Sequence, residues 1–98
     1  MALDDTMRVD LEKYIDKVIA EIPDAVSFLL SPSNKTQLQI ENRDDFVFGL
    51  ALGNIQGMLA THFYNKKGRL LNEEEFKEAG SIMFKRVGDI HKAIFNAG

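Results

Sequence analysis

The chain has 98 residues, 45% of them hydrophobic and 28% charged, with a formal net charge of −3. This balance predicts one folded domain over residues 1–98 and excludes a disordered chain. Because there is no cysteine, disulfide scaffolds, thiol nucleophiles and cysteine-ligated metal sites are excluded. We find no apolar leader and no continuous apolar stretch of roughly 18 residues, so we expect a cytoplasmic protein that does not enter a membrane.

Charge is distributed unevenly along the chain. Residues 1–61 carry five basic and ten acidic side chains, and residues 62–98 carry seven basic and five acidic ones. A nucleic-acid-binding domain usually has a much more strongly basic face. The pattern therefore favours a protein partner over a phosphate backbone.

The first predicted element is a helix over residues 5–22. Its apolar residues recur in steps of three and four, which places them on one face; they are Met7, Leu11, Tyr14, Ile15, Val18, Ile19 and Ile22. Asp4 and Asp5 supply a cap and the negative charge that a helix start favours. Pro23 lacks a backbone donor, so we expect a break or kink near Ile22.

Two structures are compatible with residues 23–41. Pro23 to Ser31 fits either a short helix or a strand, and residues 36–41 alternate polar and apolar side chains as a strand does. A turn cluster at residues 31–34 separates the two stretches. The segment is therefore either a helix followed by a loop or a short β-hairpin at 26–41, which would need a helix or a partner beneath it.

A second helix is predicted over residues 45–64, and it is apolar on nearly every side. Such a helix is normally buried on most sides. One other helix cannot cover all of those sides. Asn54 and Gln56 interrupt it, and with its limited length they argue against a membrane span. We therefore expect a homodimer that covers what the chain itself leaves open.

The third predicted helix covers residues 72–95. Asn72 and Glu75 form a capping-box pattern at its start, while Gly68 suits the left-handed position that ends the preceding helix. Together the second and third helices predict a long antiparallel helical hairpin on which the helix at 5–22 packs. The predicted fold is thus mainly α, a small helical bundle.

Glycines recur every four positions in the second helix, at Gly49, Gly53 and Gly57, and Ala60 continues the row within about one helical turn. Each interior glycine lowers the stability of a helix by roughly 1 kcal/mol relative to alanine. We therefore expect these small residues to have a packing role, which is to permit a close helix crossing. Three occupants fit the resulting groove: a helix of the same chain, through Ala79 and Gly80; the same helix of a second subunit; or a ligand.

Few residues suggest chemistry. No metal-binding spacing accompanies His62 or His91, and no ordered catalytic constellation links the serines, histidines and acids; we therefore expect no catalytic residue, metal or cofactor. A ligand pocket near Asn54 and His91 is one alternative. Weak nucleic-acid binding by the turn at 63–69 is another, for which the candidate contacts are Lys66, Lys67 and Arg69.

The leading hypothesis is a non-enzymatic, homo-oligomerising helical protein that acts as a protein–protein interaction or assembly module. It follows from the excess of apolar surface on the second helix and from the absence of a catalytic pattern. An active site shared between subunits stays open, since one sequence does not show which groups meet across an interface.

Overall fold

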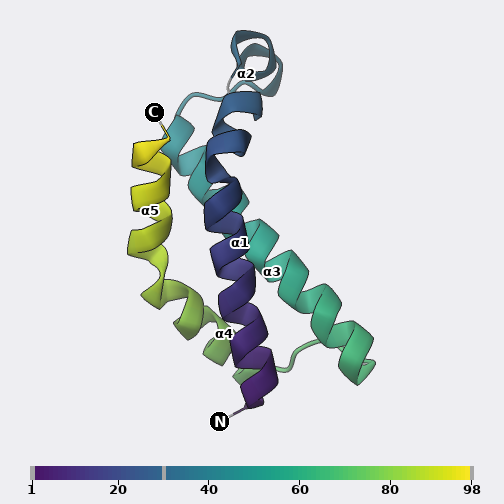
Figure 1. Ribbon diagram of the computed structural model, residues 1–98. Helices are drawn as coiled ribbons and strands as arrows, with labels where there is room; N and C mark the ends of the chain where they lie inside the picture. Colours follow the sequence, from purple (N-terminus) through teal and green to yellow (C-terminus); the bar gives the residue numbers. More distant parts are fainter. Residues whose placement is uncertain (1, 30, 98) are drawn as a thin grey trace.

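The computed structural model describes residues 2–29 and 31–97. Within these ranges the chain is mainly α-helical and contains no strand. The helices are α1 (Asp5–Leu29), α2 (Pro32–Leu38), α3 (Arg43–Lys67), α4 (Glu73–Lys85) and α5 (Val87–Asn96). The molecule is elongated, at 43 × 24 × 18 Å. In Figure 1, α1 runs along its length, flanked by α5 and α3, and the short α2 lies at the end that also holds the C-terminus.

The core lies where α1, α3 and α5 meet. The apolar stripe predicted for the first helix is its centre, since Leu11 and Ile15 are fully buried. Both α3 and α5 pack on this stripe and on each other, and α4 adds a smaller contact with α1. The main buried side chains of these partners are Val47, Ala51, Ile55, Leu59, Phe63, Ala79, Met83, Ile90 and Ile94.

Of the break or kink expected near Ile22, the break is wrong, because α1 continues through Pro23 to Leu29. Proline inside a helix removes one backbone hydrogen bond and costs about 3 kcal/mol. The buried stripe nevertheless continues from Ile22 to Val26 across the proline. Burial of those side chains against the core outweighs the local penalty.

The alternative of a β-hairpin at 26–41 is also wrong. The first residues of this segment form the end of α1. Pro32–Leu38 forms α2, with Pro32 in its first turn. Thr36 Oγ1 donates to the Pro32 carbonyl at 2.9 Å, and Asn34 Nδ2 donates to the Phe28 carbonyl at 2.8 Å. These bonds within the segment favour a helical turn over the alternating strand pattern.

The helix predicted over 72–95 is two helices, joined at Arg86. This residue has φ −104° and ψ 4°, which ends α4 before α5 starts at Val87. Its side chain pairs with Asp16 at 2.7 Å and with Glu12 at 3.1 Å, both on α1, and with Asp89 at 2.8 Å. The joint lets α5 pack on α1 and α3, while α4 lies closer to α1 than to α3. The prediction of a simple two-helix hairpin is therefore wrong at this point, because its second helix is divided in two.

Candidate functional site

Local hydrogen bonds define both ends of α3. Asn42 accepts a bond from the Asp45 N–H at 2.9 Å, and Gly68 ends the helix with φ 71°, its N–H bonded to the Tyr64 carbonyl. The left-handed conformation at Gly68 is one that glycine adopts without a steric penalty. The left-handed Gly68 confirms the prediction from sequence, and the resulting helix is longer at each end than the expected 45–64.

One face of α3 packs on the core and the opposite face is open. Ile55 and Phe63 point inward, with 0% and 1% of their surface exposed, whereas Phe46 and Tyr64 are 36% and 55% exposed. Residues 46–65 contain no Asp, Glu, Lys or Arg. The described chain therefore leaves part of this helix uncovered, and the outer face is uncharged.

The glycines of α3 lie on this open face. A methyl group added at Gly49, Gly53 or Gly57 would meet no atom of the described residues within 4 Å. No helix in the described part of the chain therefore makes the close crossing that these glycines permit. Of the three occupants considered from the sequence, a second subunit and a ligand are left.

An apolar groove separates α3 from α4. It has a volume of about 380 Å³. Gly53, Gly57 and Ala60 line one wall, and Ala79 and Gly80 line the other. The small residues that we paired from sequence thus face the same groove without packing against each other. Phe76, 57% exposed, and Leu71 complete its apolar lining.

A second, more open groove lies on the other side of the same glycines, next to α1. It has a volume of about 600 Å³, and its polar lining includes Asn54, Thr61, His62 and Asn65. Tyr14 also lines this groove. The Tyr14 ring contacts the His62 ring edge to face, with 5.8 Å between the ring centroids. His62 and Tyr14 therefore connect α3 to α1 at this groove.

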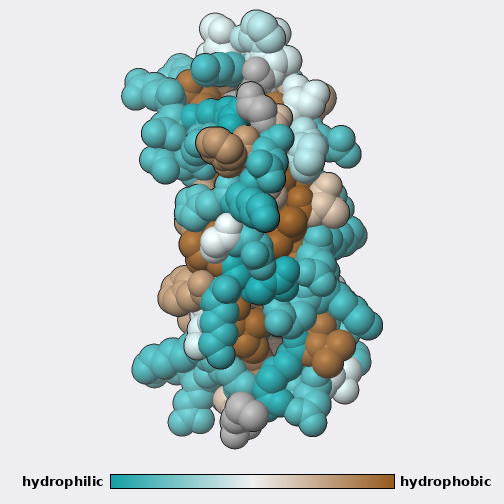
Figure 2. All heavy atoms as spheres, turned by 60° about the vertical axis from the view of Figure 1, so that its left-hand side comes forward, coloured by the Kyte–Doolittle hydropathy of each residue, from teal (hydrophilic) through white to brown (hydrophobic). Residues whose placement is uncertain are grey.

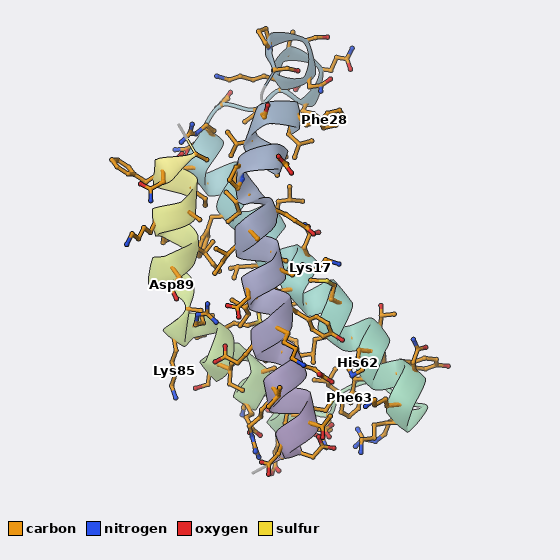
Figure 3. The ribbon with its side chains drawn as sticks, viewed as in Figure 1. Lys17, Phe28, His62, Phe63, Lys85 and Asp89 are labelled. Carbon is orange, nitrogen blue, oxygen red and sulfur yellow. The ribbon has the colours of Figure 1, made fainter. Side chains whose placement is uncertain are left out.

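His62 is held by an acidic partner that sequence reasoning missed. Its Nε2 lies 2.8 Å from Oδ2 of Asp10, on α1. Burial, followed by the charge of Asp10, raises the pKa of Tyr14 above its ordinary value. Figure 3 shows His62 on the lower half of α3, on the side of α1. Because 52 residues separate the two groups, no local spacing could have indicated the pair.

The structure does not bring the two candidate pocket residues together. Asn54 lines the groove next to α1. His91 instead stacks flat on Phe48, with 4.2 Å between ring centroids and 7° between ring planes. His91 therefore packs on an aromatic ring of α3, and the groove that Asn54 lines does not include His91.

Two of the three cations proposed for nucleic-acid contact are engaged within the chain. Lys67 Nζ lies 3.4 Å from Asp4 Oδ2. Arg69 donates to both carboxylate oxygens of Glu75, at 2.8 and 3.1 Å, and its guanidinium lies 5.0 Å from the centre of the Phe63 ring. Lys66 is exposed. The turn is therefore tied to α1 and α4, and most of its positive charge is compensated.

Most of the phenylalanine side chains are exposed. Of the seven phenylalanines, five are exposed: Phe28, Phe46, Phe76, Phe84 and Phe95. Figure 2, which brings the side of α4 and α5 forward, shows hydrophobic side chains reaching the surface between hydrophilic ones. Contiguous apolar patches mark binding sites in soluble proteins, whereas apolar side chains exposed singly are common.

By length and composition alone, α3 could also cross a membrane. With 25 residues, α3 is longer than the helix predicted over 45–64. Its length therefore does not argue against a membrane span. Core helices of soluble proteins meet the same criteria. Among the described residues, no group of three His, Asp or Glu side chains is arranged to hold a metal ion.

Comparisons with protein-family models, curated proteins and solved structures find no match to this chain.

Proposed function

We propose that the protein is a non-enzymatic, homo-oligomerising module that uses the outer face of α3 for protein–protein interaction. One observation carries this proposal: the open face of α3 is uncharged, and its glycines have empty space above them. Three interior glycines weaken a helix by about 3 kcal/mol in total. No contact within the described chain makes use of the missing side chains, so their use is expected at an intermolecular contact.

The exposed aromatics support the same proposal. Phe46 and Tyr64 lie on α3 on either side of the glycines, and Phe76 lies across the groove on α4. Aromatic side chains supply much of the binding energy at the centres of protein interfaces, because they bury a large apolar area with few rotatable bonds. This surface is a better fit to a protein partner than to a charged ligand.

Alanine substitutions at the glycines test this proposal. In an isolated chain, Gly53→Ala and Gly57→Ala should each raise the free energy of unfolding by about 1 kcal/mol, because a methyl group there meets nothing. In a dimer with a close crossing, each added methyl group meets the partner. The dissociation constant of the dimer should then rise about 5- to 150-fold, the equivalent of about 1–3 kcal/mol of overpacking.

Gly88→Ala is the matched control, since Gly88 lies on α5 and is also free of contacts within 4 Å among the described residues. It should stabilise the helix and leave dimer dissociation unchanged. Sedimentation equilibrium and thermal unfolding of the three variants provide the two readouts. If Gly53→Ala and Gly57→Ala behave like Gly88→Ala, the α3 face is not an interface.

A small-ligand-binding role is the second candidate, and the groove next to α1 is the observation that favours it. There Tyr14, Asn54 and His62 combine an aromatic surface with hydrogen-bonding groups. Native mass spectrometry of protein purified from its own cells would show a ligand as a mass above that of the chain. Nucleic-acid binding is less well supported, because Lys67 and Arg69 are already ion-paired.

A further inference from the structure

The outer face of α3 has a symmetry that specifies its partner. Ile55 is fully buried, so it marks the inner side of the helix. At about 100° per residue, positions nine before and nine after Ile55 point directly away from the core, and positions two before and two after point within about 20° of that direction. These positions are Phe46, Tyr64, Gly53 and Gly57.

This set reads alike in both directions: aromatic, glycine, glycine, aromatic. Reversing the helix about Ile55 exchanges Phe46 with Tyr64 and Gly53 with Gly57. A two-fold symmetric interface requires such self-complementarity, because one patch must match a rotated copy of itself. The face of α3 meets this requirement in the antiparallel orientation.

Charge at the ends of α3 favours the same orientation. Around its N-terminus, residues 41–45 hold three acidic side chains and one basic one. In its last turn the exposed Lys66 is basic, while Lys67 and the following Arg69 are paired with Asp4 and Glu75 of their own chain. Two antiparallel copies place the acidic end of one helix next to the basic end of the other. Their helix dipoles then point in opposite directions, which is the favourable arrangement. A parallel pair would bring like charges together.

We propose that the occupant of this face is a second copy of the chain, docked antiparallel with the two-fold axis level with Ile55. Gly53 then lies against Gly57 of the partner subunit, and Phe46 against Tyr64 of the partner subunit. The grooves on either side of the glycines receive the flanking side chains of the incoming helix. This arrangement rests on the proposed self-association and adds its orientation and register.

Disulfide trapping tests the register, and the chain suits it because it has no cysteine of its own. Leu50 and Thr61 lie on α3, at the edge of its open face that is nearer to α1. Both residues line grooves together with α1 residues. Their levels are nearly symmetric about Ile55, so Leu50 of one copy lies beside Thr61 of the partner subunit. Within one chain the two are about 16 Å apart along the helix, too far for a disulfide.

The doubly substituted chain, Leu50→Cys with Thr61→Cys, should therefore become a covalent dimer on mild oxidation. Each single variant should stay uncrosslinked, because its two cysteines lie on opposite sides of the axis, about 15–18 Å apart along the helices. Ala20→Cys, at an exposed position on α1, controls for random oxidation. Sedimentation equilibrium of the reduced variants and of the unsubstituted chain accompanies the gels.

The outcomes separate the two proposals. Crosslinking of the double variant alone supports the antiparallel register. Crosslinking of either single variant would show a parallel pair, and a dimeric mass without crosslinking would place the interface elsewhere; both overturn the register and leave self-association intact. A monomeric mass for the unsubstituted chain would overturn both.

Discussion

At the residue scale, two buried or half-buried glutamates connect the turns of this protein to its helices. Glu75 completes the capping box with Asn72 and accepts both bonds from Arg69, and Glu78 accepts from Arg8 and from the Leu3 N–H at 2.8 Å each. The guanidinium of Arg69 lowers the pKa of Glu75, and that of Arg8 lowers the pKa of Glu78. Each carboxylate is thus stabilised in its charged form by the fold.

These lowered pKa values predict acid sensitivity. Because the folded pKa of each glutamate lies below its ordinary value of 4.5, both contribute stability above pH 4.5, and that contribution is lost as the pH falls through the folded values. Thermal unfolding between about pH 6 and about pH 3 should show this decline. Glu75→Gln should flatten it, and the exposed neighbour Glu74 provides the control variant Glu74→Gln. An equal slope in all three proteins would contradict the assignment.

Residue-scale features were predictable where the interacting groups are close in sequence. The caps at Asn42 and Asn72 and the left-handed Gly68 depend on neighbours within about four positions. The Asp10–His62 pair and the anchoring of Leu3 by Glu78 join residues that are 52 and 75 positions apart. Their geometry depends on how α1 lies on α3 and α4, which local spacing does not encode.

At the element scale, tertiary packing overrides local signals in both directions. Pro23 fails to end α1 because Ile22 and Val26 stay buried on either side of it. Arg86, a good helix former, ends α4, because its side chain and backbone turn the chain toward Glu12 and Asp16 on α1. The three helical stripes could be read from the sequence, whereas the position of these two joints could not.

The interpretation of Pro23 predicts that its removal stabilises the protein. In Pro23→Ala the new N–H can donate to the Ile19 carbonyl, so we expect the free energy of unfolding to rise by about 1–3 kcal/mol. Chemical denaturation with urea measures this change. Pro23→Gly, which restores the donor without the helix propensity of alanine, should give a smaller gain. A loss of stability in Pro23→Ala would show that α1 requires the proline.

At the scale of the whole molecule, the fold leaves its most apolar helix half uncovered. The sequence indicated that three helical elements could not enclose residues 45–64, and the structure locates the uncovered side at Gly53, Gly57 and the flanking Phe46 and Tyr64. Which helix would cover the glycines could not be read from periodicity, because periodicity defines faces and not the neighbours that meet them. We propose that self-association covers this face.

Sedimentation equilibrium of the unsubstituted chain over a wide range of concentrations tests this self-association. We expect a species of twice 11.1 kDa that dissociates on dilution, as a reversible dimer does. A mass of 11.1 kDa at every concentration would contradict it.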